Sequence, residues 1–112
     1  MLGLERGIMT DDELCRDAVE RWGEDDQMIV AVEELSELVH ALTKLCRGNT
    51  PDRAASIAEE IADVELVLKQ VVFIMERHHH EWFSLYLDLV RTHKRERLQG
   101  RIERSVREHA EM

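Results

Sequence analysis

The chain has 112 residues, of which 44% are hydrophobic, 35% are charged and only 4% are aromatic, and it contains a single proline. So few turn-forming and aromatic residues argue against a small β-sandwich or barrel, and the length suits one compact domain with a modest core, so we expect a single all-α domain over residues 1–112. The formal net charge of −9 disfavours a nucleic-acid partner, because binding the phosphate backbone requires clustered Lys and Arg.

The chain contains no stretch that approaches 18 uninterrupted apolar residues, so no membrane-spanning helix and no membrane partner are expected. Cys15 and Cys46 stand alone without a CxxC motif, and residues 1–10 lack the apolar run of a signal peptide. These features predict a protein of the reducing cytoplasm.

The first two helices have clear start and stop signals. Thr10 followed three residues later by Glu13 has the spacing of a capping box, which predicts a helix from about Asp11 to Trp22. Gly23 then ends that helix, and acidic residues 24–26 supply the N-cap and first-turn charges of a second helix. We expect the second helix to continue to about Arg47.

The motif RGNTPDR marks the next boundary. Gly48 suits the left-handed residue after a helix, Thr50 suits an N-cap and Pro51 suits the first helical position. The third helix is therefore predicted to begin at Pro51 and to continue to about Arg77.

The three consecutive histidines 78–80 contain no glycine or proline, so a helix break there is inferred from helix length and from the changed phase of the apolar residues. A fourth helix is predicted from Glu81 to about Leu98. Gly100 would then be a kink or an end before a frayed terminal helix.

Apolar residues of the second helix recur at alternating steps of four and three, which predicts one core-facing stripe: Met28, Val32, Leu35, Val39, Leu42 and Cys46. Glu34 and Glu37 lie on a neighbouring strip together with Val30 and Ala41. Glu33 points roughly opposite the stripe, so we expect it to face solvent or to lie just behind the metal ligands.

The third helix carries acidic residues where packing would favour leucine. Its apolar stripe is predicted to contain Ile57, Val64, Val67, Leu68, Val71 and Met75. Glu60 falls inside this stripe and Asp63 at its edge. Because a carboxylate removed from water must be protonated or find a cation, and because Lys44 and Lys69 are poorly placed to pair with these groups, the pattern indicates a bound cation.

Carboxylate oxygens select hard cations, so Mg²⁺ is the expected ion and Mn²⁺ its usual substitute. The absence of Cys and His from these acidic pairs argues against structural zinc. Mg²⁺ held by a few carboxylates normally keeps water and substrate phosphate oxygens in its other positions, so a nucleotide site is the resulting hypothesis.

The order EExxE and then ExxD, formed here by Glu33, Glu34, Glu37, Glu60 and Asp63, resembles the signature of the MazG-like all-α nucleoside triphosphate pyrophosphohydrolases. The flanking segments WGEDDQMIVAVEELSEL, EEIADVELVL and HKRERLQGRIE are similar to those of short phage and bacterial members, so the resemblance covers residues 22–103. It implies a four-helix-bundle-like fold and hydrolysis between the α and β phosphates of a nucleoside triphosphate. It also implies Mg²⁺ coordination by Glu34, Glu37, Glu60 and Asp63.

Either Glu33 or Glu37 would accept the proton of the attacking water, and the sequence does not choose between them. Gln27 lies seven residues before Glu34 and Gln70 seven after Asp63, so both lie on the acidic side; substrate contact and simple surface polarity explain them equally well. Three roles are open for the Lys44 side chain: it contacts a phosphate, forms an ion pair with Glu37, or faces solvent.

Glu76 and His79 have the ExxH spacing of ferritin-like di-iron bundles. Those sites need a second such pair, which is missing, so the histidines are interpreted as a helix junction or an exposed face.

Two functions remain in competition. One is a magnesium-dependent nucleotide-pool pyrophosphohydrolase, and the other is a non-catalytic acidic helical interaction module that binds a divalent metal. Because a chain of this length buries limited surface and leaves apolar stripes to cover, and because the family forms dimers or tetramers, we expect a homodimer or homotetramer.

Overall fold

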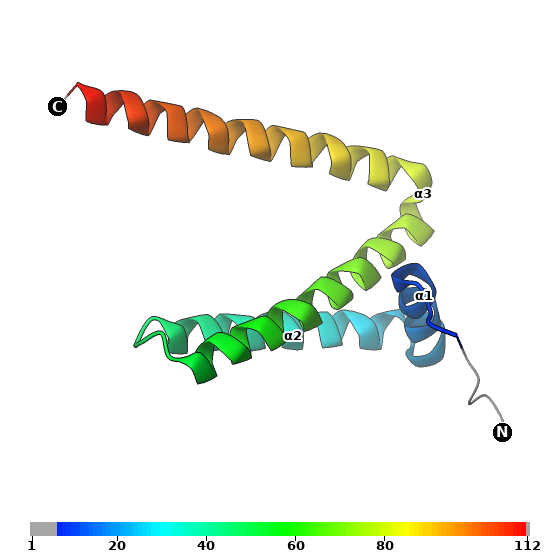
Figure 1. The fold of residues 1–112 in the computed structure, drawn as a ribbon. Helices are drawn as coiled ribbons and strands as arrows, with labels where there is room; N and C mark the ends of the chain where they lie inside the picture. The colour runs from blue at the N-terminus through cyan, green and yellow to red at the C-terminus, as the bar shows by residue number, and fades with distance from the viewer. Residues whose placement is uncertain (1–6, 112) are drawn as a thin grey trace. The chain divides into compact units, whose positions relative to one another are not determined.

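The computed structural model describes residues 7–111, and every regular element within that range is a helix. The helices are α1 (Asp11–Trp22), α2 (Glu24–Leu45) and α3 (Pro51–Ala110), as Figure 1 shows. The predicted all-α class is confirmed. None of the described helices combines the length and the apolar character that a membrane span requires. The chain divides between Met75 and Glu76 into two compact units, which are described separately below as unit 1 and unit 2.

Helix α1 begins and ends where the sequence predicts. The backbone N–H of Glu13 donates to Thr10 Oγ1 at 3.2 Å, and the backbone N–H of Thr10 donates to Glu13 Oε1 at 3.4 Å, which completes the capping box. Gly23 then adopts a φ of 93°, a conformation that favours glycine. This single residue separates α1 from α2.

Helix α2 ends at Leu45, slightly before the predicted Arg47. Helix α3 begins at Pro51 as predicted, and Thr50 Oγ1 accepts a hydrogen bond from the backbone N–H of Arg53 at 3.3 Å. The short turn between the two helices reverses the chain direction, so α2 and the first part of α3 run antiparallel within unit 1 (Figure 1).

Helix α1 covers the other two helices of unit 1 at one end. Its buried residues are Cys15 and Val19, and the Cys15 thiol donates to the carbonyl oxygen of Leu66 at 3.9 Å. An ion pair between Asp11 and Lys69, 3.0 Å long, fixes the same contact at the surface. The buried hydrophobic residues of the described chain all belong to unit 1: Cys15, Val19, Ala31, Ala41, Val64, Val67 and Ile74.

The core stripe predicted for α2 is wrong. Val32 is 64% exposed and Val39 is 63% exposed, while the residues of α2 that are buried are Gln27, Ala31 and Ala41. These lie about one residue step, or about 100°, around the helix from the predicted stripe. The small alanines allow α3 to approach closely, and helical periodicity cannot tell which of two neighbouring faces another helix will cover.

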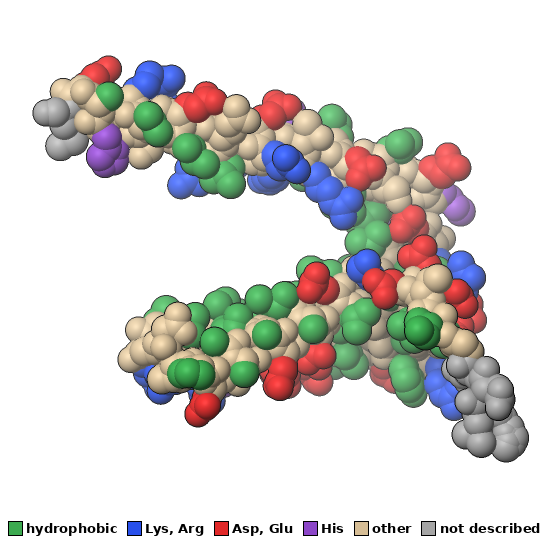
Figure 2. All heavy atoms as spheres, viewed as in Figure 1, with side chains coloured by type: hydrophobic (Ala, Val, Ile, Leu, Met, Phe, Trp, Pro, Cys, Tyr) green, Lys and Arg blue, Asp and Glu red, His purple; other side chains and the backbone are tan. Residues whose placement is uncertain are grey.

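The stripe predicted for α3 is confirmed in part. Val64 and Val67 are buried, but Leu68 is 45% exposed, and the prediction omitted the buried Ile74. Glu60 is half-buried, as expected of a carboxylate within an apolar stripe. Figure 2 shows how many hydrophobic side chains remain on the surface of the helices.

Unit 2 contains the rest of α3. His80 has a φ of 53° and a ψ of −147°, so the helix breaks within the predicted segment 78–80. The predicted kink or end at Gly100 is wrong, since the helix continues to Ala110. One glycine costs a helix only about 1 kcal/mol, and a side-chain hydrogen bond from Gln99 to Glu103, 2.9 Å long, spans Gly100.

Candidate functional site

The acidic residues meet because α2 and α3 pair in one continuous antiparallel register. Near the start of α2 the side-chain amide of Gln27 donates to Gln70 Oε1. Seven residues further along α2 and seven back along α3, Glu34 lies beside Asp63, whose carboxylate contributes to the raised pKa of Glu34. The next step of three residues brings Glu37 beside Glu60. The two acidic motifs of the sequence therefore face each other.

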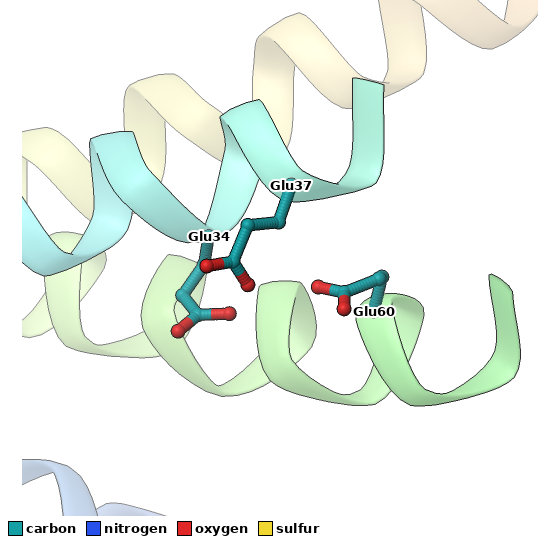
Figure 3. Close-up of side chains that lie close together, drawn as sticks. All are labelled: Glu34, Glu37 and Glu60. Carbon is teal, nitrogen blue, oxygen red and sulfur yellow. The ribbon is translucent and has the colours of Figure 1, made fainter. Parts of the chain in front are cut away.

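Three of the four predicted metal ligands form a tight group. Glu34, Glu37 and Glu60 each place one carboxylate oxygen within 4.8 Å of the others. Figure 3 shows their carboxylates turned towards one another in the space between the two helices. Asp63 is exposed and joins this carboxylate cluster through Glu34.

The cluster holds negative charge without a basic partner. Among residues 7–111, none of the four carboxylates is ion-paired with Lys or Arg. Burial, followed by the neighbouring carboxylates Glu37, Asp63 and Glu60, raises the pKa of Glu34. Burial, followed by Glu37 and Asp63, likewise raises the pKa of Glu60. Both shifts express the cost of placing several like charges together in a half-buried space.

The donor atoms fit a hard divalent cation. Glu34 Oε2 and Glu60 Oε2 are both buried, and neither accepts a hydrogen bond from the described part of the chain. Buried carboxylate oxygens normally have a hydrogen-bond donor or a metal ion as partner. Since every available ligand is a carboxylate oxygen, Mg²⁺ and Mn²⁺ suit the cluster better than zinc.

The remaining predicted residues lie in three different settings. Glu33 is exposed and is not part of the carboxylate cluster. Gln27 is only 6% exposed and uses its amide on Gln70, so each glutamine has a partner within unit 1. Lys44 is exposed and lines a small pocket together with Glu37 and Glu60.

The structure also places residues near the cluster that sequence reasoning missed. His40, Arg53 and Ser56 line the same small pocket as Lys44. The signal was present in the sequence: Arg53 and Ser56 precede Glu60 by seven and four residues, and His40 follows Glu37 by three. Those steps place side chains on one face of a helix, but only the helix pairing brings the two faces together.

A larger apolar pocket lies at the other end of the paired helices. Its volume is about 730 Å³, and Leu14, Trp22, Leu66 and Gln70 are among the residues that line it. Leu66 and Gln70 follow Asp63 on α3 by three and seven residues, so the pocket lies one to two turns from the carboxylate cluster. Trp22 at this pocket is 58% exposed.

Comparison with known proteins yields no relative. No model of a known protein family matches the chain, and neither the curated proteins nor the solved structures contain a match.

Proposed function

We propose that the chain is a magnesium-dependent pyrophosphohydrolase of the MazG-like kind, which converts a nucleoside triphosphate into the monophosphate and pyrophosphate. The observation that carries the proposal is the carboxylate cluster, in which Glu34, Glu37 and Glu60 converge within 4.8 Å. Such convergence is electrostatically unfavourable for an empty protein and favourable around a divalent cation. The order of the acidic motifs along the chain agrees with that function.

In this proposal Glu34, Glu37, Glu60 and Asp63 hold the metal. When bound, such an ion would supply charge neutralisation for the triphosphate oxygens and would make an attacking water more acidic. Glu33 and Glu37 were the two predicted proton acceptors, and only the carboxylate of Glu37 lies in the cluster. We therefore assign the proton released when water attacks the α-phosphorus to Glu37, through the carboxylate oxygen that does not hold the metal.

The nucleoside part of the substrate is assigned to the apolar pocket between α1 and α3. Its lining residues Leu66 and Gln70 lie on the same helix as Asp63. Nucleobases bind to apolar and aromatic surfaces with a few polar groups for orientation, and the exposed ring of Trp22 provides such a surface.

A homodimer is part of the proposal. The exposed apolar stripe of α2, defined here as Val32, Leu35, Val39 and Leu42, spans three helical turns without a cover in unit 1. A row of apolar side chains on a helix normally packs against another helix. Pairing α2 and the first part of α3 with the same segments of a second copy would produce a four-helix bundle.

The free thiol of the exposed Cys46 suits a reducing cytoplasm.

The decisive experiment is a substrate panel. Canonical and modified ribo- and deoxyribonucleoside triphosphates are incubated with protein and Mg²⁺, and the release of pyrophosphate and monophosphate is measured. A Glu60→Gln/Asp63→Asn double variant is the control for contaminating enzymes. Wild-type activity that is absent across the panel, and is not restored by Mn²⁺, would instead favour the non-catalytic metal-binding interaction module.

A further inference from the structure

A small pocket adjoins the carboxylate cluster on the side of the α2–α3 turn. Its volume is about 130 Å³, and Glu37 and Glu60 of the cluster form one wall. The residues that line it are Glu37, His40, Ala41, Lys44, Arg53, Ser56 and Glu60. It therefore combines two ligands of the proposed metal site with two cationic side chains, a histidine and a hydroxyl group.

The same antiparallel pairing of α2 and α3 that forms the carboxylate cluster also places the residues of this pocket side by side. Lys44 follows Glu37 on α2 by seven residues, and Arg53 precedes Glu60 on α3 by seven residues. Seven residues span about 10 Å along a helix axis. The paired helices thus present acidic residues at one level and, two turns closer to the turn, a pair of basic residues.

The basic side chains retain free donors. Arg53 uses Nη1 to donate to the carbonyl oxygen of Gly48 at 2.9 Å, which anchors the guanidinium and leaves its other N–H groups available. Within residues 7–111, Lys44 makes no ion pair or hydrogen bond, although Glu37 and Glu60 line the same pocket.

We propose that this pocket binds the terminal phosphates of the substrate, the part that leaves as pyrophosphate, through Lys44, Arg53 and Ser56. The assignment rests on the proposed function and gives the substrate a direction: its polyphosphate end points to the α2–α3 turn and its nucleoside to α1. Glu37 and Glu60 would repel a phosphate, so the pocket accepts pyrophosphate only when a divalent cation neutralises the cluster.

The test measures binding of inorganic pyrophosphate by calorimetry, with and without Mg²⁺, after circular dichroism has shown that each variant is folded. Wild-type protein should bind pyrophosphate only when Mg²⁺ is present. Lys44→Gln and Arg53→Gln should each weaken this binding about tenfold or more, because each removes charged hydrogen-bond donors. Arg53→Lys, which keeps the charge, should recover part of the affinity.

Two controls make the measurement specific. Arg47→Gln removes the same charge near the turn from a side chain that does not line the pocket, and it should bind pyrophosphate like wild type. Nucleoside monophosphate should bind the Lys44 and Arg53 variants as it binds wild type. Wild-type protein that binds no pyrophosphate with Mg²⁺ present, or pocket variants that bind it as tightly as Arg47→Gln does, would overturn the assignment.

The assignment and the proposed function can fail separately. If nucleoside triphosphates are hydrolysed but pyrophosphate binds equally well to wild type and to the Lys44 and Arg53 variants, the proposed function stands and the assignment of the pocket is wrong. If Mg²⁺-dependent pyrophosphate binding requires both residues but no triphosphate is cleaved, the pocket stands as a polyphosphate site and the enzyme is wrong.

Discussion

The face of α2 that packs against α3 carries smaller and more polar side chains than the face that remains exposed. Burial of apolar area alone would favour the opposite arrangement. The face turned towards α3 contains Gln27, Ala31 and Ala41, together with the half-buried Glu34. The exposed apolar stripe of α2 carries the larger side chains, and even its least exposed member, Leu35, is 40% exposed. Burying the stripe would remove more apolar surface from water, at about 25 cal/mol per Å².

The contrast agrees with the proposed function, in which the inner face of α2 would serve the metal site and the outer face would pack against a second copy. Alanine permits close helix approach, and close approach brings the carboxylates of α2 and α3 within reach of one cation. The larger side chains remain available for association, where a continuous apolar row contributes most. Substitutions on each face test this division.

The largest effect is expected where α3 meets the inner face of α2, at the proposed metal ligands Glu60 and Asp63. Glu60→Gln and Asp63→Asn keep the side-chain size and remove one charge, so each should lower turnover by about a hundredfold or more. The metal-free fold should be unchanged or slightly more stable, because repulsion is relieved. Mg²⁺ should raise the melting midpoint of wild type by mass action and should not raise that of either variant.

Glu65→Gln is the matched control, since Glu65 lies on the same helix, is exposed and is outside the cluster. It should retain activity and the Mg²⁺-induced rise in the midpoint. If Glu60→Gln and Asp63→Asn lost stability without metal yet still released pyrophosphate, these two residues would belong to a structural charge network instead.

The outer face is tested by a charge in the apolar stripe. Val39→Asp should weaken self-association about a hundredfold, or about 3 kcal/mol, because it places an unpaired carboxylate in an apolar interface. Analytical ultracentrifugation over a concentration series measures the change, and Val39→Ile, which stays apolar, should associate like wild type. A wild-type protein that remains monomeric at micromolar concentration would remove the dimer from the proposal.

A pair of neighbouring substitutions compares the two faces directly. Ala31 is 4% exposed and Val32 is 64% exposed. Ala31→Leu should cost about 1–3 kcal/mol through overpacking between α2 and α3, whereas Val32→Leu should change stability by less than about 0.5 kcal/mol. Urea unfolding gives both values when it is measured in the Val39→Asp background, in which the stripe should remain uncovered. Equal costs there would mean that both faces are equally covered within one chain.

The smallest expected effect is a change of the melting midpoint with pH in metal-free protein, caused by the carboxylates of the cluster. Because the pKa values of Glu34 and Glu60 are raised by folding, the folded state holds these protons more tightly than the unfolded chain does. Their repulsion is therefore strongest at neutral pH and is relieved as the pH falls through the raised pKa values towards the ordinary glutamate value of about 4.3. The contribution of the cluster to the melting midpoint should therefore increase as the pH falls from neutral towards the ordinary glutamate pKa.

Thermal melts of a Glu34→Gln/Glu60→Gln variant provide the reference, because its midpoint should lack this contribution. With Mg²⁺ the trend should reverse, since metal ligands must lose their protons to bind. A wild-type midpoint that follows the variant's at every pH without metal would show that the two carboxylates titrate normally.

Local signals explain which parts of the fold were predictable. The capping box at Thr10 and Glu13 and the Thr50–Pro51 pair each act within one helical turn, so the sequence predicted both helix starts correctly. The break within residues 78–80 was also found. Gly100 was misjudged because helix formers and a side-chain bridge on either side outweigh one glycine.

The sequence by itself determined that the chain is helical and that acidic residues recur at steps that align them on one side of each helix. Those properties depend on neighbours three and four positions apart. Only the tertiary structure decided which face of α2 meets α3. That choice brings Glu34, Glu37 and Glu60 together and places Lys44 and Arg53 around one pocket. The physical reason is that two faces about 100° apart on one helix both carry apolar residues. The choice between them depends on how closely a distant segment can approach, which periodicity does not encode.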